Sequence, residues 1–148
     1  MSSSNDPPAF QVFTEIAIID QLARHQMERA LPDGLKVSQF GVLNHLVRLG
    51  GHWAPARLAS AFQVTKGAMT NTLQRLEKRG LVQIVADPED GRAKIVTITD
   101  VGRDMRVRCL ECVGPVIGDL SRQFSDKEFE MILPVLERLR KYLDQSRS

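Results

Sequence analysis

The spacing of the apolar residues changes once in the middle of this chain, and that change limits the possible folds more than any other feature. Residues 66–80 carry apolar side chains at helical spacing. Residues 81–85 and 93–98 are rich in strand-forming residues and flank the turn-forming cluster 87–91. This order predicts a helix that leads directly into a short antiparallel hairpin.

Helical patterns lie on both sides of this hairpin. Ser38 and Thr65 are suited to cap the starts of helices, and Gly80 is suited to the left-handed position that ends one. Ser125 and Glu128 have the spacing of a capping box. The expected fold class is therefore mainly α with a small antiparallel β-wing. Together with their capping residues, the predicted helices cover 9–30, 38–49, 55–62, 65–80, 99–124 and 125–143.

Composition and length fit one ordinary globular domain. The chain has 148 residues, of which 43% are hydrophobic and 26% charged. No apolar run is long enough to cross a membrane, so we expect no membrane partner. Residues 1–8 are rich in serine and proline and do not have the pattern of a signal peptide. The expected location is therefore the cytoplasm.

The positive charge is concentrated in the middle of the chain. Residues 53–98 contain seven cationic and four anionic side chains, a net charge of +3, whereas the whole chain has +2. A protein that binds a polyanion requires such a local excess. A solvated surface of mixed charge gives the same count by chance, so the charge alone identifies no partner.

The types of side chain in this segment suit double-stranded DNA. On a helix that enters the major groove, Asn71 and Gln74 can pair with adenine edges, and Arg75 can read guanine or bind a phosphate. The hairpin can lie along the neighbouring backbone with Arg92 in the minor groove. We expect Asp90 to hold the Arg92 guanidinium in an ion pair and so to aim it.

A single pattern runs through residues 56–59, 62–70, 76–82, 87–92, Ile98-Thr99 and Gly102. This pattern resembles the winged helix-turn-helix of MarR-type (multiple antibiotic resistance) transcriptional regulators. The order of the flanking helices is also similar, so the resemblance covers nearly the whole chain. Two positions differ from many members, which have a basic residue near Gln83-Ile84 and a second arginine where Gly91 stands.

The resemblance implies a winged helix-turn-helix within a helical dimerisation frame. It divides a single domain, 1–148, into a flexible tail at 1–8, dimerisation helices at 9–34 and 100–148, and a winged helix-turn-helix lobe at 38–98. The function it implies is sequence-specific DNA binding by a homodimer, most often a repressor. The partner is a pseudo-palindromic operator, and a small aromatic or anionic ligand would release the protein from it.

The resemblance places Lys66, Thr70, Asn71 and Arg75 at the major groove and Arg92 in the minor groove. The alternative is that the cations of this helix form only a solvated face. Together, the two arguments predict DNA binding by Thr65, Lys66, Ala68, Thr70, Asn71, Gln74, Arg75, Asp90, Arg92 and Lys94.

An effector site is expected where the second helix ends, around His45, Arg48 and Trp53, because Arg48 can hold an anion. Trp53 suits a hydrophobic plug equally well. Cys109 and Cys112 lie three apart on an apolar helix face, where free cysteine behaves as a small hydrophobic residue. The alternative reading is a thiol-redox-responsive regulator that uses this pair.

Other classes of function receive less support from the sequence. The three histidines are dispersed, so we predict no metal site and no cofactor. No catalytic set of nucleophile and base, pair of carboxylates or glycine-rich phosphate loop occurs, which argues against an enzyme. A winged-helix module that binds proteins but not DNA remains an alternative.

Overall fold

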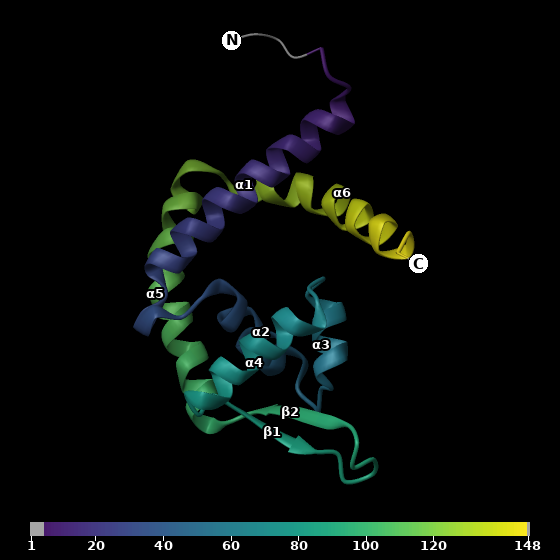
Figure 1. Ribbon diagram of the computed structural model, residues 1–148. Helices are drawn as coiled ribbons and strands as arrows, with labels where there is room; N and C mark the ends of the chain where they lie inside the picture. The colour runs from purple at the N-terminus through teal and green to yellow at the C-terminus, as the bar shows by residue number, and fades with distance from the viewer. Residues whose placement is uncertain (1–4, 148) are drawn as a thin grey trace. The chain divides into compact units, whose positions relative to one another are not determined.

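The computed structural model describes residues 5–147, which form mainly helices and one two-stranded antiparallel sheet (Figure 1). The chain divides into two compact units, of which the first ends at Val113 and the second begins at Gly114. The predicted fold class is confirmed. The elements are α1 (Pro8–Ala30), η1 (Pro32–Gly34), α2 (Val37–Leu49), α3 (Pro55–Ala61), α4 (Lys66–Lys78), β1 (Val82–Ala86), β2 (Lys94–Ile98), α5 (Asp100–Gln123) and α6 (Asp126–Gln145).

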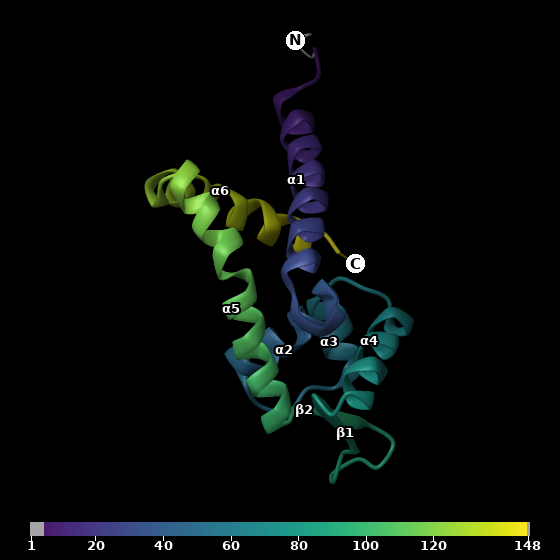
Figure 2. The same cartoon turned by 90° about the vertical axis from the view of Figure 1, so that its left-hand side faces the viewer.

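The first unit is built around one hydrophobic core. Leu43 of α2, Leu58 of α3, Leu76 of α4 and Val96 of β2 are all fully buried in it. Cys109 adds the first half of α5 to the same cluster. Figure 2 shows α2 between this half of α5 and the α3–α4 pair. The burial of one face of each element fixes α3, α4 and the hairpin relative to one another.

Most of the predicted helix ends are confirmed. The Thr65 hydroxyl accepts a hydrogen bond from the backbone N–H of Ala68 at 3.1 Å, and Gly80 has a φ of 73° just after α4. The prediction of Ser38 as an N-cap is wrong, because α2 begins one residue earlier, at Val37. The Gln39 side chain instead accepts the N–H of Lys36 at 3.0 Å, which caps the helix from inside its first turn.

The predicted tail at 1–8 is only partly within the described residues. Residues 1–4 lie outside them, and Pro8 already belongs to α1. Proline suits this first helical turn because its missing N–H would have no partner there.

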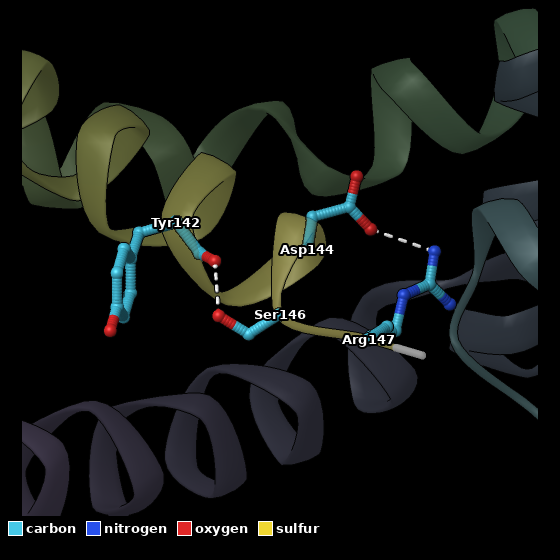
Figure 3. A network of polar contacts seen from close by, with 4 residues as sticks. All are labelled: Tyr142, Asp144, Ser146 and Arg147. Atoms are coloured by element: carbon cyan, nitrogen blue, oxygen red, sulfur yellow. Dashed lines mark hydrogen bonds and ion pairs between the residues drawn. The ribbon is translucent and has the colours of Figure 1, made fainter.

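The second unit contains the end of α5 and the whole of α6. The predicted capping box is present, since the Ser125 hydroxyl accepts the N–H of Glu128 at 3.2 Å and the Glu128 carboxylate accepts the N–H of Ser125 at 3.1 Å. At its other end, Ser146 Oγ donates to the Tyr142 carbonyl oxygen at 2.9 Å (Figure 3). Arg147 pairs with Asp144 at 2.7 Å, so both ends of α6 are held by local hydrogen bonds.

Candidate nucleic-acid interface

A tight turn sets α4 against α3. Gln63 adopts a left-handed conformation with a φ of 58°, and the N–H of Val64 donates to the Ala59 carbonyl oxygen at 3.0 Å. The chain therefore reverses within a few residues, and α4 starts directly after α3 ends. Met69, Leu73 and Leu76 bury the inner face of α4, which leaves its polar face outside.

The outer face of α4 is polar and cationic. Lys66, Arg75 and Lys78 stand on this helix with Glu77 as its one acidic residue. Arg75 Nε donates a hydrogen bond to Asn71 Oδ1 at 2.8 Å, so two predicted base-reading side chains already contact each other. All the predicted DNA-binding residues are exposed, on α4 and its cap (Thr65, Lys66, Ala68, Thr70, Asn71, Gln74, Arg75) and on the hairpin (Asp90, Arg92, Lys94).

The hairpin forms the predicted wing. Val82 pairs with Ile98 at its base, and Ala86 pairs with Lys94 at its outer end. Beyond this last pair the tip closes on itself, since the N–H of Asp87 donates to the Ala93 carbonyl oxygen at 2.9 Å. The tip is therefore a structured turn that projects from the strands.

The predicted ion pair between Asp90 and Arg92 is wrong. Asp90 Oδ1 accepts the backbone N–H of Arg92 at 3.1 Å, and no ion pair joins their side chains in the part of the chain that the structure describes. A spacing of two residues favours this local turn, in which the carboxylate reaches the backbone first. The Arg92 side chain is exposed at the wing tip.

Two contacts that sequence reasoning missed hold the wing to the rest of the lobe. Trp53 and Val96 exchange backbone hydrogen bonds of 3.3 and 2.8 Å, which add a one-residue bridge to the edge of β2. On the opposite edge, Glu77 Oε2 of α4 accepts the N–H of Ile84 at 3.1 Å. No local sequence pattern predicts either contact, because each joins residues of different structural elements.

A third junction joins the wing to α5. Thr99 Oγ1 donates to the Gly80 carbonyl oxygen at 2.6 Å and accepts the N–H of Gly102 at 3.0 Å. A Cβ added at Gly102 would collide with the Leu81 carbonyl oxygen, so only glycine permits this close approach. These contacts fix the ends of α4 and β2 at the start of α5.

The predicted effector residues His45 and Trp53 pack against each other. Their rings meet edge to face at 4.4 Å between centroids, and Phe62 lies 5.2 Å from the His45 ring. The Trp53 indole N–H donates to the Gly50 carbonyl oxygen at 2.8 Å. Trp53 therefore acts as a structural link between α2, α3 and the wing.

The electrostatic surroundings of His45 disfavour its charged form. Its Nε2 atom is buried and has no hydrogen-bond partner. Burial lowers the pKa of His45, and the nearby charges of Arg48 and Arg57 lower it further. Arg57 also lies over the Trp53 ring, 4.4 Å from its centroid, so the cluster already holds a cation.

A cavity of about 230 Å³ opens beside the end of α2. It lies within the first unit, and two basic side chains, His52 and Arg103, contribute to its wall. His45, Arg48 and Trp53 do not line it, although Arg48 is exposed on the same helix. The full lining is Leu46, Gly50, Gly51, His52, Thr97, Ile98 and Arg103.

The two cysteines differ in their surroundings. Cys109 is fully buried, and burial raises the pKa of its thiol to about 11. Cys112 is half-buried, and both are free thiols. A protonated, buried thiol is a poor nucleophile, which argues against the redox alternative. Among residues 5–147 no group of acidic, histidine or cysteine side chains is arranged to hold a metal ion, and no helix is long and apolar enough to cross a membrane.

Comparison with known proteins assigns the lobe. The sequence model of the MarR family matches residues 33–93, which include the whole helix-turn-helix and the tip of the wing. The transcriptional activatory protein BadR of Rhodopseudomonas palustris is 27% identical over 119 residues, which are 76% of this chain and 68% of BadR. The regulator PecS of Dickeya dadantii is 27% identical over 115 residues, 76% of this chain and 69% of PecS. Residues 33–93 of this chain therefore match the MarR family.

The curated relatives that this chain matches are transcriptional regulators, and these similarities support a DNA-binding transcriptional regulator rather than an enzyme. Its fold matches the crystal structure of a MarR variant from E. coli complexed with operator DNA. That match has a TM-score of 0.79 at 24% identity and covers 93% of this chain and 99% of the other.

Proposed function

We propose that the protein binds a pseudo-palindromic operator with α4 in the major groove and the wing in the adjacent minor groove. The observation that carries this proposal is the outer face of α4, which is polar, cationic and exposed beside a wing whose Arg92 is also exposed. A helix of this kind is the element that reads base edges in helix-turn-helix proteins.

Each exposed side chain has a role that its chemistry suits. Asn71 and Gln74 pair with adenine edges, and Arg75 reads guanine or holds a phosphate. Lys66, in the first turn of α4, binds the phosphate backbone of DNA as a point charge. Arg92 enters the minor groove, where the negative potential is strongest over narrow A·T-rich stretches. Thr65, Ala68, Thr70, Asp90 and Lys94 complete the contact surface.

The active species is a homodimer held by α1, the end of α5 and α6. Neither α1 nor α6 has a buried residue, and Met131 on α6 is 70% exposed. On each of these helices, exposed apolar surface of this extent indicates an interface with another chain. The exposed apolar residues include Phe10, Phe13, Ile16, Ile19 and Leu22 on α1, and Ile132, Leu133, Val135, Leu136, Tyr142 and Leu143 on α6.

We further propose that the dimer acts as a repressor which a small anionic ligand releases from its operator. The relative BadR is named as an activator. We therefore expect the position of the operator relative to the promoter to decide whether binding represses or activates transcription. The ligand binds at the exit of α2, where Arg48 is exposed and Arg103 and His52 border the cavity. It acts through unequal affinity for the DNA-bound and free arrangements.

The DNA-binding proposal is tested by selecting duplexes that bind the full chain and then comparing variants on the selected site. Lys66→Ala and Arg92→Ala should both weaken binding, whereas Lys127→Ala, a matched exposed cation in α6, should not. A selected site without two-fold symmetry, or equal effects of all three variants, would contradict the proposal.

The ligand proposal is tested with a panel of aromatic carboxylates in thermal-shift and operator-competition measurements. A true effector weakens operator binding, and DNA must weaken effector binding by the same factor. Arg103→Ala should abolish the effect of the ligand if the anion binds in the cavity. Arg48→Ala should abolish it if the anion binds on the outer face of α2. Ligands that raise the melting temperature but leave operator affinity unchanged would contradict release through this site.

A further inference from the structure

The wing is held from both of its edges at one cross-strand pair of residues, Ile84 and Val96. Ile84 of β1 lies opposite Val96 of β2. The backbone groups of Val96 bond to Trp53, on the side away from β1. The N–H of Ile84 points away from β2 in turn, and there the Glu77 carboxylate accepts it at 3.1 Å. Both outer edges of the same residue pair are therefore anchored to other parts of the lobe.

These anchors matter because a two-stranded hairpin alone is marginally stable in water. Trp53 anchors β2 through its backbone, so no change of side chain removes the hydrogen bonds directly. Glu77 anchors β1 through its side chain, and it belongs to α4, the helix that is proposed to face DNA. Glu77 is therefore the one side chain among the described residues that hydrogen-bonds the helix to a wing strand.

We propose that Glu77 is a positioning residue that fixes the wing relative to α4 and thereby determines where Arg92 meets DNA. This inference rests on the proposed function, in which α4 and Arg92 occupy neighbouring grooves. Glu77 itself does not need to touch DNA. Its role is to make two separate contact surfaces, the helix and the wing tip, fit the duplex at the same time.

A small tilt of the wing at the Ile84–Val96 pair produces a larger displacement of the wing tip. Arg92 lies four residues before Val96, in the turn at the wing tip, so at most roughly 13 Å of chain separates it from the anchored pair. A tilt of about 10° at this pair therefore displaces the tip by up to roughly 2 Å, more than a precise polar contact tolerates. Loss of the Glu77 hydrogen bond thus weakens a contact made far from Glu77.

The charge of Glu77 provides a way to separate positioning from electrostatics. A carboxylate on α4 repels phosphate, so the removal of its charge alone should favour DNA binding. Glu77→Gln and Glu77→Ala remove the same charge, but only glutamine keeps an oxygen that can accept the N–H of Ile84. The two variants are therefore matched in charge and differ in the hydrogen bond.

The experiment measures operator affinity for these two variants, with and without Arg92→Ala, using the full chain at a temperature where every variant is folded. We expect Glu77→Gln to bind as tightly as the wild type or more tightly. Glu77→Ala should bind about three- to tenfold more weakly than Glu77→Gln, as the loss of one hydrogen bond implies. In the Arg92→Ala background this difference should shrink, because the minor-groove contact of the wing is no longer there to be misplaced.

Amide hydrogen exchange in the absence of DNA gives a second readout. The Ile84 amide should exchange faster in Glu77→Ala than in Glu77→Gln, whereas the Val96 amide, which Trp53 holds, should be unchanged and so report that the lobe remains folded.

Two results would overturn the inference. Equal operator affinity of Glu77→Ala and Glu77→Gln, while Arg92→Ala is weakened, would contradict it and leave the proposed DNA contacts intact. No effect of Arg92→Ala on affinity would contradict the proposed wing contact itself, and the inference with it.

Discussion

Arg75 Nε donates a hydrogen bond to Asn71 Oδ1 at 2.8 Å, across one turn of the exposed face of α4. An asparagine that reads adenine uses the same oxygen to accept from the base. The bond therefore orders both side chains in the free protein and has to be exchanged for a base contact when DNA binds. The two residues act as one unit.

This exchange leads to the first prediction. Asn71→Ala should relax the preference at one base pair of each half-site by about 1–3 kcal/mol. Its effect should not add to that of Arg75→Ala, because each variant alone already breaks the shared bond. The measurement is binding to a set of duplexes with single substitutions. An equal loss of affinity on every duplex would show that Asn71 reads no base.

The second prediction concerns assembly. The exposed apolar faces of α1 and α6 should bury roughly 2,000 Å² or more in a constitutive dimer, the range of obligate partners. Ile132→Arg should dissociate it, because a charge would be buried without a partner. Lys127→Arg on the same helix is the control. Sedimentation of the wild type as a monomer at micromolar concentration would contradict the dimer.

The third prediction concerns pH. Burial lowers the pKa of His45 below its usual value of 6.5, so the unfolded chain binds this proton more tightly than the folded one. Stability should therefore fall as the pH decreases from about 7 to about 5. His45→Phe keeps a ring against Trp53 and removes the unpartnered nitrogen, so it should flatten this dependence. If thermal unfolding gave the same pH dependence of stability for both proteins, the lowered pKa of His45 would be contradicted.

The fourth prediction concerns the cysteines. With its pKa raised to about 11, Cys109 should react with a thiol reagent only after unfolding, whereas the half-buried Cys112 should react more readily. Operator affinity should be insensitive to mild peroxide. Loss of binding that a thiol reductant restores, and that is absent in Cys109→Ser and Cys112→Ser, would favour a redox switch instead.

The parts of the fold that depend on neighbouring residues could be predicted from the sequence. The Thr65 cap, the left-handed Gly80 and the Ser125–Glu128 capping box are all set within a few residues, and all three are confirmed. Helices and strands could also be told apart, because their apolar residues repeat with different periods.

The contacts that join different structural elements could not be predicted. Glu77 has the same sequence signature as any exposed acidic residue on a helix, and only the packed lobe brings it to Ile84. Trp53 suited either a ligand site or a plug, and its backbone pairing with Val96 appears only when the hairpin is folded. The Asp90 prediction failed because side-chain chemistry alone does not say whether the backbone or the guanidinium of Arg92 is nearer.

The most direct test of the central claim is the salt dependence of operator affinity in the wild type, Lys66→Ala and Arg92→Ala. Each phosphate contact that is lost should reduce the slope of log affinity against log salt by about one unit per half-site. We predict this reduction for Lys66→Ala on every sequence. For Arg92→Ala we predict a loss that is largest where the wing meets A·T-rich flanks. Unchanged slopes and affinities in both variants would show that neither α4 nor the wing is the surface that binds DNA.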